Sequence, residues 1–303
     1  MTITKYPEGE IYSKITAAAA VAGTNSNNKS STIAVIFIHA AIADHTLWDA
    51  QVDFLSTKGI TCVQYDVLGF GSSAASQAYL TSEPRPEIDH MKHISDLIEH
   101  VKRTTSGSVV EKVVIAGLSM GAGFALRFAT LHPDVVVDGV VCAAGVVAGY
   151  NPESWPKEEE EKDEAIEVAV QAGEIEKAAR MQVAYWADGP LQKEGRCASE
   201  VRERLYKWCF DIAKRRFDKT GGSDLPRIAY PAYSQETLRG LNVPFAVALG
   251  RFDETVVNGM MEYLADAVKE ADLHRFDSGH MINLECPDEF NQWLYSWIEQ
   301  KVM

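Results

Sequence analysis

Apolar residues along the chain follow two patterns that alternate with each other. Short continuous apolar runs are typical of strands buried on both faces of a parallel sheet. We interpret as strands the runs at 33–38, 61–65, 113–116, 135–142, 243–250 and 273–276, with a weakly alternating edge strand at 8–15. Stretches with helical spacing separate them, at 48–58, 87–103, 125–129, 256–270 and 287–302. This alternation predicts a doubly wound, mostly parallel α/β sheet.

The pattern changes between residues 150 and 235, where the buried apolar runs give way to charged sequence with helical spacing. Residues 157–164 are charged throughout, which is typical of a solvated helix face. Residues 165–216 carry aromatic and methionine side chains at helical spacing. We interpret this interval as an inserted helical cap. The predicted organisation is an α/β core at 1–149 and 236–303, with the cap at 150–235.

The composition suits one large α/β domain or a domain with an insertion, and it argues against several partners. The 303 residues are 46% hydrophobic, and 43 acidic against 29 basic residues give a formal net charge of −14. That charge would repel the phosphate backbone of a nucleic acid and an anionic membrane surface. No apolar run reaches the roughly 18 residues that a bilayer requires, and residues 1–7 lack the basic-then-apolar pattern of a secretory signal. We therefore expect a cytoplasmic protein that binds neither nucleic acid nor membrane.

The cysteines indicate neither a disulfide framework nor a zinc site. They are odd in number and scattered, and no two form a CxxC pair. Buried structural thiols in a reducing compartment fit this pattern best. We expect no metal and no cofactor. The five residues are Cys62, Cys142, Cys197, Cys209 and Cys286.

The stretch around Ser119 has the pattern of a strand, a sharp turn and a helix. The run at 113–116 leads into Gly117-x-Ser119-x-Gly121, and helical sequence follows. Glycine two positions to either side of the serine removes Cβ atoms that would collide in so sharp a turn. The turn lifts the hydroxyl above the sheet, at a helix N-terminus whose N–H groups face any anion that forms there. The pattern predicts a nucleophile elbow with Ser119 as the nucleophile.

A serine hydroxyl becomes nucleophilic at neutral pH when a base takes its proton and an acid orients that base. His280, in a loop after the last predicted strand, is the candidate base. Asp253, just past the strand at 243–250, is the candidate acid, and the adjacent Glu254 could point inward in its place. Each of these residues follows a predicted strand, at the edge where open α/β sheets bind ligands.

With its nucleophile, acid and base in that order, the sequence resembles the α/β-hydrolase fold family. The resemblance covers nearly everything from residue 33 to 303 and rests on several matching pieces. These are His39-Ala40 with Trp48 downstream, residues 66–72, 117–121 and 250–253, and Gly279-His280 followed by Glu285-x-Pro287. The family usually has His-Gly where this chain has His39-Ala40. The resemblance implies an oxyanion hole made by the backbone N–H groups of Met120 and Ala41.

Side chains of the predicted cap are the candidates for a substrate pocket. Met181, Tyr185 and Trp186 either line an apolar acyl pocket or pack in the core of the cap. His39 is a further candidate beside the pocket, although a hydrogen bond within its own loop is the simpler interpretation. Aromatic side chains in a helical cap favour a small to medium apolar substrate.

The resemblance implies a cofactor-free serine hydrolase that cleaves an ester or lactone through an acyl-enzyme, similar to the esterase and enol-lactonase-like branches. A serine at the elbow argues against the dehalogenases and epoxide hydrolases of the family, which use aspartate there. Several alternatives stay open: a C–C bond (β-diketone) hydrolase, a thioesterase or an aminopeptidase, a cofactor-free lyase on the same residues, and a non-catalytic ligand-binding module. The sequence is compatible with a homodimer, and it leaves the substrate open.

Overall fold

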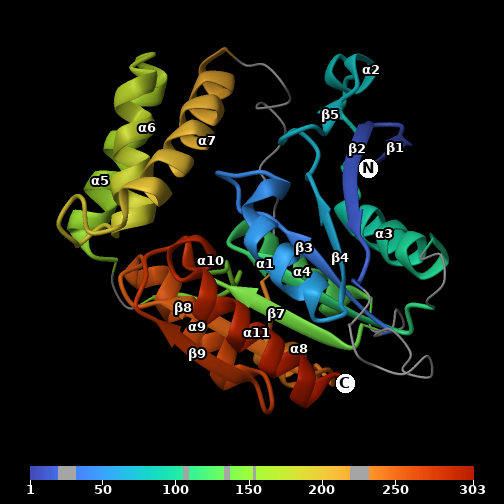
Figure 1. Cartoon of the computed structure of the whole chain (residues 1–303). Coiled ribbons are helices and arrows are strands. Elements are labelled where there is room, and N and C mark those ends of the chain that lie inside the picture. The colour runs from blue at the N-terminus through green and yellow to red at the C-terminus, as the bar shows by residue number, and fades with distance from the viewer. Residues whose placement is uncertain (20–31, 105–108, 133–136, 153–154, 219–231) are drawn as a thin grey trace.

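The computed structural model describes residues 1–19, 32–104, 109–132, 137–152, 155–218 and 232–303 (Figure 1). Within these residues nine strands form one sheet, in the order β1-β2-β4-β3-β6-β7-β8-β9, with the short β5 paired to β2. All neighbouring pairs from β4 to β9 are parallel, and the pairs that involve β2 are antiparallel. The predicted doubly wound, mostly parallel sheet is confirmed. The strands are β1 (Thr2–Tyr6), β2 (Gly9–Thr16), β3 (Ile33–Ile38), β4 (Thr61–Tyr65), β5 (Ala74–Ala75), β6 (Lys112–Leu118), β7 (Gly139–Ala143), β8 (Phe245–Gly250) and β9 (Asp272–Phe276).

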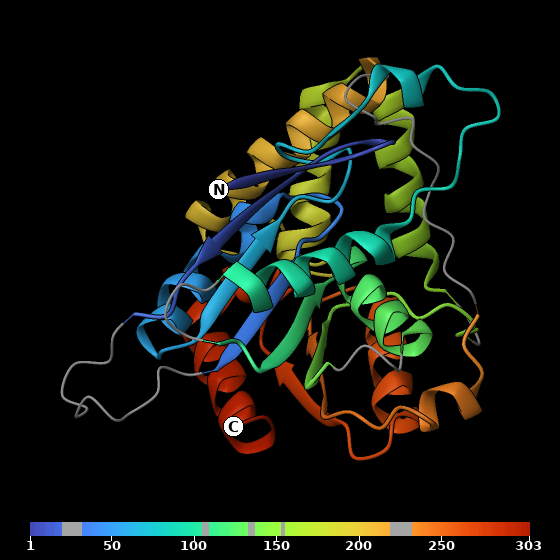
Figure 2. The same ribbon diagram turned by 90° about the vertical axis from the view of Figure 1, so that its right-hand side faces the viewer.

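Helices cover both faces of the sheet, as Figure 2 shows. On one face α1, α10 and α11 pack on the strands, with Leu55 and Phe290 in the shared apolar cluster. On the other face α3, α4, α8 and α9 do the same, with Ile94, Phe124 and Leu264 in a second cluster. These helices are η1 (His45–Trp48, 3₁₀), α1 (Asp49–Thr57), α2 (Gln77–Leu80), α3 (His90–Thr104), α4 (Met120–Leu131), α8 (Gln235–Arg239), α9 (Thr255–Ala267), α10 (Ile282–Glu285) and α11 (Pro287–Lys301).

Strand burial follows the apolar pattern of the sequence. Every residue of β3, β4, β7 and β8 is buried, because helices cover both faces of these strands. The alternating run predicted as an edge strand forms β2, but the prediction that it lies at the edge of the sheet was wrong. Residues Thr2–Tyr6 form an additional strand, β1, which pairs with β2 on the side away from β4 and takes the edge.

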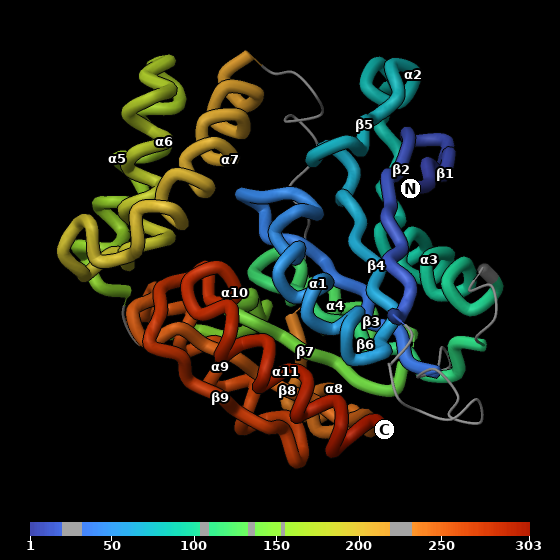
Figure 3. The backbone as a smooth tube through the Cα atoms, viewed as in Figure 1, coloured from blue at the N-terminus to red at the C-terminus, as the bar shows by residue number. Residues whose placement is uncertain are grey.

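The chain leaves the sheet after β7 and forms a separate group of helices before it returns, as Figures 1 and 3 show. We call residues 157–218 the helical insertion; Ala169, Ala178 and Ala213 contribute to an apolar cluster of its own. It lies within the interval predicted as a cap, of which residues 153–154 and 219–231 fall outside the described part. Its elements are α5 (Lys157–Gln171), α6 (Ile175–Val183), the π-helical turn η2 (Ala184–Asp188) and α7 (Ser199–Asp218).

In the described part of the chain, no helix combines the length and the apolar character that a membrane crossing requires. The five cysteine thiols are unpaired, and all but the half-exposed Cys286 are buried. Burial raises the pKa of the Cys62 and Cys142 thiols well above the usual value, which keeps both protonated and unreactive.

Candidate active site

Ser119 lies in a strained turn between β6 and α4. Its backbone has φ 56° and ψ −116°, a conformation that non-glycine residues rarely adopt and that costs about 1–3 kcal/mol. A hydrogen bond from its own N–H to the Ala143 carbonyl oxygen, at 2.8 Å, helps hold the turn against the end of β7. Ser119 therefore lies at the carboxyl edge of the sheet, at the N-terminus of α4. This is the geometry expected of the predicted elbow.

The two glycines that flank the turn are required by close backbone contacts. A Cβ atom at Gly117 would lie 2.1 Å from the backbone of Gly121. A Cβ atom at Gly121 would lie 2.1 Å from the Ile38 carbonyl oxygen at the end of β3. Since real Cβ atoms do not approach so closely, α4 can pack against β6 and β3 only with glycine at both positions.

Asp253 and His280 are joined at the same edge of the sheet. Asp253 follows β8, His280 follows β9, and 2.8 Å separates Asp253 Oδ2 from His280 Nδ1. The second carboxylate oxygen of Asp253 accepts the backbone N–H of Glu254 at 2.7 Å. Burial alone would lower the pKa of His280, but the charge of Asp253 and its hydrogen bond outweigh burial and raise it above the usual value.

Glu254, the alternative acid, makes a different contact. Its carboxylate accepts a hydrogen bond from the Tyr185 hydroxyl of the helical insertion at 2.5 Å. Burial raises its pKa to about 7, and the nearby charges of Asp253 and Glu159 act in the same direction. Asp253, not Glu254, is therefore the carboxylate that orients His280 in this structure.

The positions predicted for the oxyanion hole flank the elbow. Met120 is the first residue of α4, and Ala41 is an exposed residue of the turn that follows β3. That turn is closed by a hydrogen bond from the Ala43 N–H to the Ala40 carbonyl oxygen at 3.1 Å. The close approach of Gly121 to the end of β3 brings α4 and this turn together.

His39 is fully buried and both of its ring nitrogens are engaged. Its Nδ1 lies 2.8 Å from the Ala40 carbonyl oxygen, and its Nε2 accepts the Val67 N–H at 3.0 Å. This requires the neutral ring with the proton on Nδ1, and burial lowers the pKa of His39 accordingly. His39 therefore joins the turn after β3 to the end of β4, as the structural interpretation expects.

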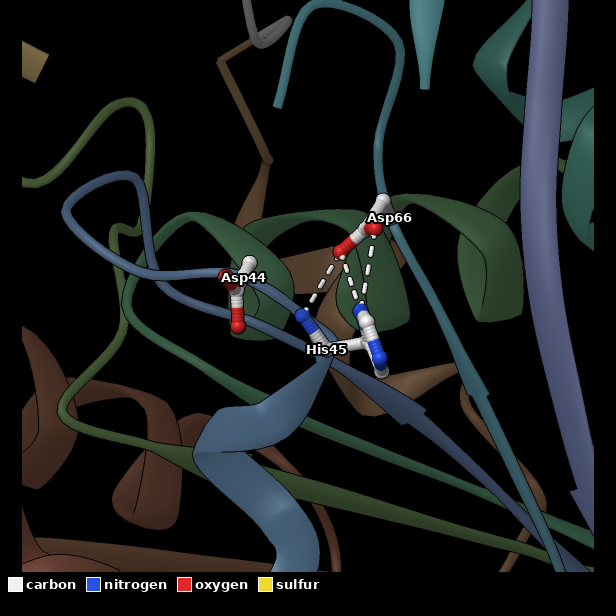
Figure 4. Close-up of side chains that lie close together, drawn as sticks. All are labelled: Asp44, His45 and Asp66. Atoms are coloured by element: carbon white, nitrogen blue, oxygen red, sulfur yellow. Dashed lines mark hydrogen bonds and ion pairs between the residues drawn. The ribbon is translucent and has the colours of Figure 1, made fainter. Parts of the chain in front are cut away.

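A second histidine–aspartate pair lies beside this turn and was not singled out from the sequence (Figure 4). His45 Nδ1 lies 3.0 Å from both carboxylate oxygens of the buried Asp66. Asp66 also accepts the backbone N–H groups of His45 at 2.7 Å and Ser72 at 2.8 Å. A Cβ at Gly71 would overlap this carboxylate, so the glycine-rich 66–72 segment is the sequence signal that could have indicated it.

Together with Asp44, this pair forms a cluster of side chains of the kinds that bind metal ions. One potential ligand atom from each residue lies within 4.8 Å of the others. The Asp44 carboxylate accepts the N–H of Thr46 at 2.9 Å and so begins η1. The Asp66 oxygens are occupied by N–H donors. The cluster therefore fits a structural role, in which it connects the turn after β3 to the turn after β4.

The candidate pocket residues separate into two groups. Trp186, in η2, packs its ring 4.6 Å from the His280 ring, and its carbonyl oxygen accepts the His280 N–H at 3.0 Å. Met181 and Tyr185 border a cavity of about 240 Å³ within the helical insertion, lined also by Ile166 and Pro190. A wider cavity of about 900 Å³ lies between α6 and α7, with Met181 and Phe210 in its wall and no triad candidate. Trp186 is therefore the pocket candidate that packs directly on His280.

Comparison with known proteins defines the class. The model of the alpha/beta hydrolase family matches residues 35–293, and the chain belongs to that family. The family resemblance drawn from the sequence is thereby confirmed, and the chain is a hydrolase by class.

Solved structures and one curated relative are similar to this chain. A thermophilic esterase from Thermogutta terrifontis has 21% identity and a TM-score of 0.68, with 100% of this chain and 98% of that chain covered. The enol-lactonase from Burkholderia xenovorans LB400 has 18% identity and a TM-score of 0.68, over 98% and 100% of the chains. The AB hydrolase superfamily protein YisY of Bacillus subtilis (strain 168) is 22% identical over 116 residues, which are 38% of this chain and 39% of that protein. At these identities the structures establish the fold.

Proposed function

We propose that the protein is a serine hydrolase that cleaves a carboxylic ester or lactone, with Ser119 as nucleophile, His280 as base and Asp253 as the acid that orients it. The observation that carries this proposal is the 2.8 Å Asp253–His280 hydrogen bond at the sheet edge where the strained Ser119 turn ends β6. A buried carboxylate bound to Nδ1 leaves Nε2 as the nitrogen that accepts the serine proton.

The reaction proceeds in two stages. His280 Nε2 takes the proton of Ser119 Oγ while Oγ bonds to the carbonyl carbon, and the carbonyl electron pair moves onto oxygen. The N–H groups of Met120 and Ala41 stabilise that oxyanion. Collapse re-forms the carbonyl and expels the alcohol oxygen, which takes the proton from His280. Water, deprotonated by His280, then repeats these steps on the acyl-enzyme and releases the acid and Ser119.

The position of the helical insertion is the reason to propose a substrate with a small to medium apolar acyl part, either an ester or a lactone. We infer that it acts as a cap over the triad, because η2 contacts His280 through both the ring and the backbone of Trp186. The half-buried indole presents apolar surface directly beside the proposed base. The similar solved proteins that are named as an esterase and an enol-lactonase carry out reactions of this type.

A C–C bond hydrolase is the second candidate. A meta-cleavage product hydrolase from Pseudomonas fluorescens IP01 has a similar fold, at 19% identity and a TM-score of 0.65 over 96% of this chain and 95% of that chain. Turnover of a β-diketone without turnover of esters would favour this reaction over ester hydrolysis.

The test is covalent labelling of the full chain with a fluorophosphonate, read by intact mass, with p-nitrophenyl acetate and butyrate turnover measured alongside. We expect one adduct and ester turnover in the parent. In Ser119→Ala the adduct disappears and turnover falls by about 10³-fold or more. Ser278→Ala is the matched control, because Ser278 is a buried serine near His280 whose hydroxyl donates to the neighbouring Gly279 carbonyl oxygen.

Two results would contradict the proposal. A folded parent that gives neither adduct nor turnover with either ester would indicate a binding module. An adduct that persists in Ser119→Ala would show that the nucleophile is another residue.

A further inference from the structure

Glu254 is a buried acid that the proposed reaction does not use. Glu254 is 7% exposed, and it directly follows the proposed triad acid Asp253 in the sequence. Its backbone N–H donates to one carboxylate oxygen of Asp253, and its side chain turns the other way, to the Tyr185 hydroxyl. One residue therefore contacts the proposed triad through its backbone and the helical insertion through its side chain.

The helical insertion holds this loop at a second point. Glu159 of α5 is fully buried, and its carboxylate accepts the Thr255 N–H at 3.1 Å and the Thr255 hydroxyl at 2.8 Å. The N-terminus of α9 is thus capped by a carboxylate from the insertion, a favourable position for negative charge. The titratable groups that act on Glu254 are Asp253 on its own loop, His280 after β9, Tyr185 in η2 and Glu159 in α5. The charge of Asp163 acts in turn on Tyr185.

We propose that Glu254 is a positioning residue that sets the proton affinity of His280 by its charge and that fastens the Asp253 loop to the insertion through Tyr185. The inference rests on the proposed function, because it concerns the base of the same site. The His280 ring is bonded to Asp253 and the Glu254 carboxylate is bonded to Tyr185, so the effect of Glu254 on that ring is electrostatic.

The direction of the effect follows from the charges. A negative Glu254 raises the pKa of His280, and a positive His280 favours the ionised form of Glu254. Burial raises the pKa of Glu254 to about 7, so Glu254 changes charge near neutral pH. When Ser119 gives its proton to His280, an ionised Glu254 adds to Asp253 in stabilising the imidazolium.

The test measures the His280 titration by NMR in the full-length protein, with the imidazole signals assigned from His280→Asn. Glu254→Gln keeps the shape and the acceptor for Tyr185 but removes the charge, so we expect the pKa of His280 to fall by about one unit. Tyr185→Phe removes a hydrogen bond that favours ionised Glu254, and we expect a shift in the same direction that is no larger. Glu254→Asp, which keeps the charge, should restore most of the parent value.

The control is Glu262→Gln, which removes one negative charge from the exposed side of α9, where Glu262 pairs with Arg275. We expect a change of about 0.2 unit or less, because exposed charges are screened. An unchanged His280 pKa in Glu254→Gln, or a shift no larger than in Glu262→Gln, would overturn the inference.

The NMR titration does not depend on turnover, so the two proposals can fail separately. If the parent takes no fluorophosphonate at Ser119 but His280 shifts as expected, serine hydrolysis is wrong and the electrostatic coupling stands. If Ser119 is labelled and His280 does not shift, only the coupling is wrong.

Discussion

At the scale of single residues, the site depends on where backbones approach each other without a side chain between them. Ser119 keeps its strained conformation because the hydrogen bond to Ala143 and the packing of α4 hold it there. Gly121 makes that packing possible, since its Cα faces the carbonyl groups of Ile38 and His39 at the end of β3. The same contact positions the turn that carries Ala41.

Gly121→Ala tests this contact. The new methyl would meet the Ile38 oxygen at 2.1 Å and the His39 oxygen at 2.9 Å, and neither backbone atom can move freely. We expect α4 to shift away from β3, with a loss of about 1–3 kcal/mol in the free energy of unfolding. Displacing the proposed oxyanion donors, Met120 and Ala41, should lower kcat for p-nitrophenyl butyrate by about 10²-fold. Urea unfolding and steady-state kinetics measure the two effects.

Gly240→Ala is the matched control. Gly240 ends α8 with φ −75°, and the nearest neighbour of an added Cβ would be 3.3 Å away. We expect a change of less than about 1 kcal/mol in stability and less than about twofold in kcat. Equal effects of the two substitutions would show that the Gly121 contact has no special importance.

At the scale of elements, the π-helical turn η2 connects the helical insertion to the loop of the proposed base. Arg196 fixes one end of this turn, with hydrogen bonds to the Ala187 carbonyl oxygen at 2.8 Å and to that of Asp188 at 2.6 Å. Its guanidinium also makes a bidentate ion pair with Glu285, which in turn accepts the Gly279 N–H at 3.0 Å. Arg196 therefore links η2 to the residue that precedes His280.

Arg196→Lys should loosen η2 from the His280 loop, because an ammonium group cannot reproduce the planar bidentate contact. We expect a loss of about 1–3 kcal/mol in stability and a fall of about tenfold or more in kcat/KM for p-nitrophenyl butyrate. Arg216→Lys is the control, since Arg216 makes a bidentate pair with Glu167 within the insertion and touches no triad candidate. If both variants lose activity equally, the position of η2 does not control the site.

The elements that could be predicted from the sequence are those whose signal is local. The apolar run at 33–38 becomes the fully buried β3, and the glycines around Ser119 indicate its turn without any knowledge of their neighbours. Contacts between distant residues carry no such signal. Tyr185 and Glu254 are 69 positions apart, and whether Asp253 or Glu254 faces His280 depends on the direction of two adjacent side chains.

At the scale of the whole molecule, buried and half-buried histidines couple stability to pH. Burial lowers the pKa of His39, His90 and His93, and that of His90 falls to about 3. Below pH 6.5 the unfolded chain therefore binds protons at these positions that the folded protein does not. The free energy of unfolding consequently decreases as the pH falls below about 6.5. For each group, this decrease continues until the pH reaches its pKa in the folded protein. Glu254 acts in the opposite direction, because its raised pKa makes the folded protein bind an extra proton between about pH 4.5 and 7.

His90→Gln isolates one of these groups. His90 packs its ring 4.9 Å from Phe124, so the substitution also changes packing, but that cost does not depend on pH. Between pH 4.5 and 6 the unfolded parent binds up to one more proton at His90 than the folded parent, which contributes a slope of up to about 1.4 kcal/mol per pH unit. We expect the variant to lose this contribution, so that its free energy of unfolding depends less steeply on pH, whatever its absolute stability. Urea unfolding curves at half-unit pH steps measure both slopes, and parallel curves for parent and variant would mean that His90 is already protonated in the folded protein at these pH values.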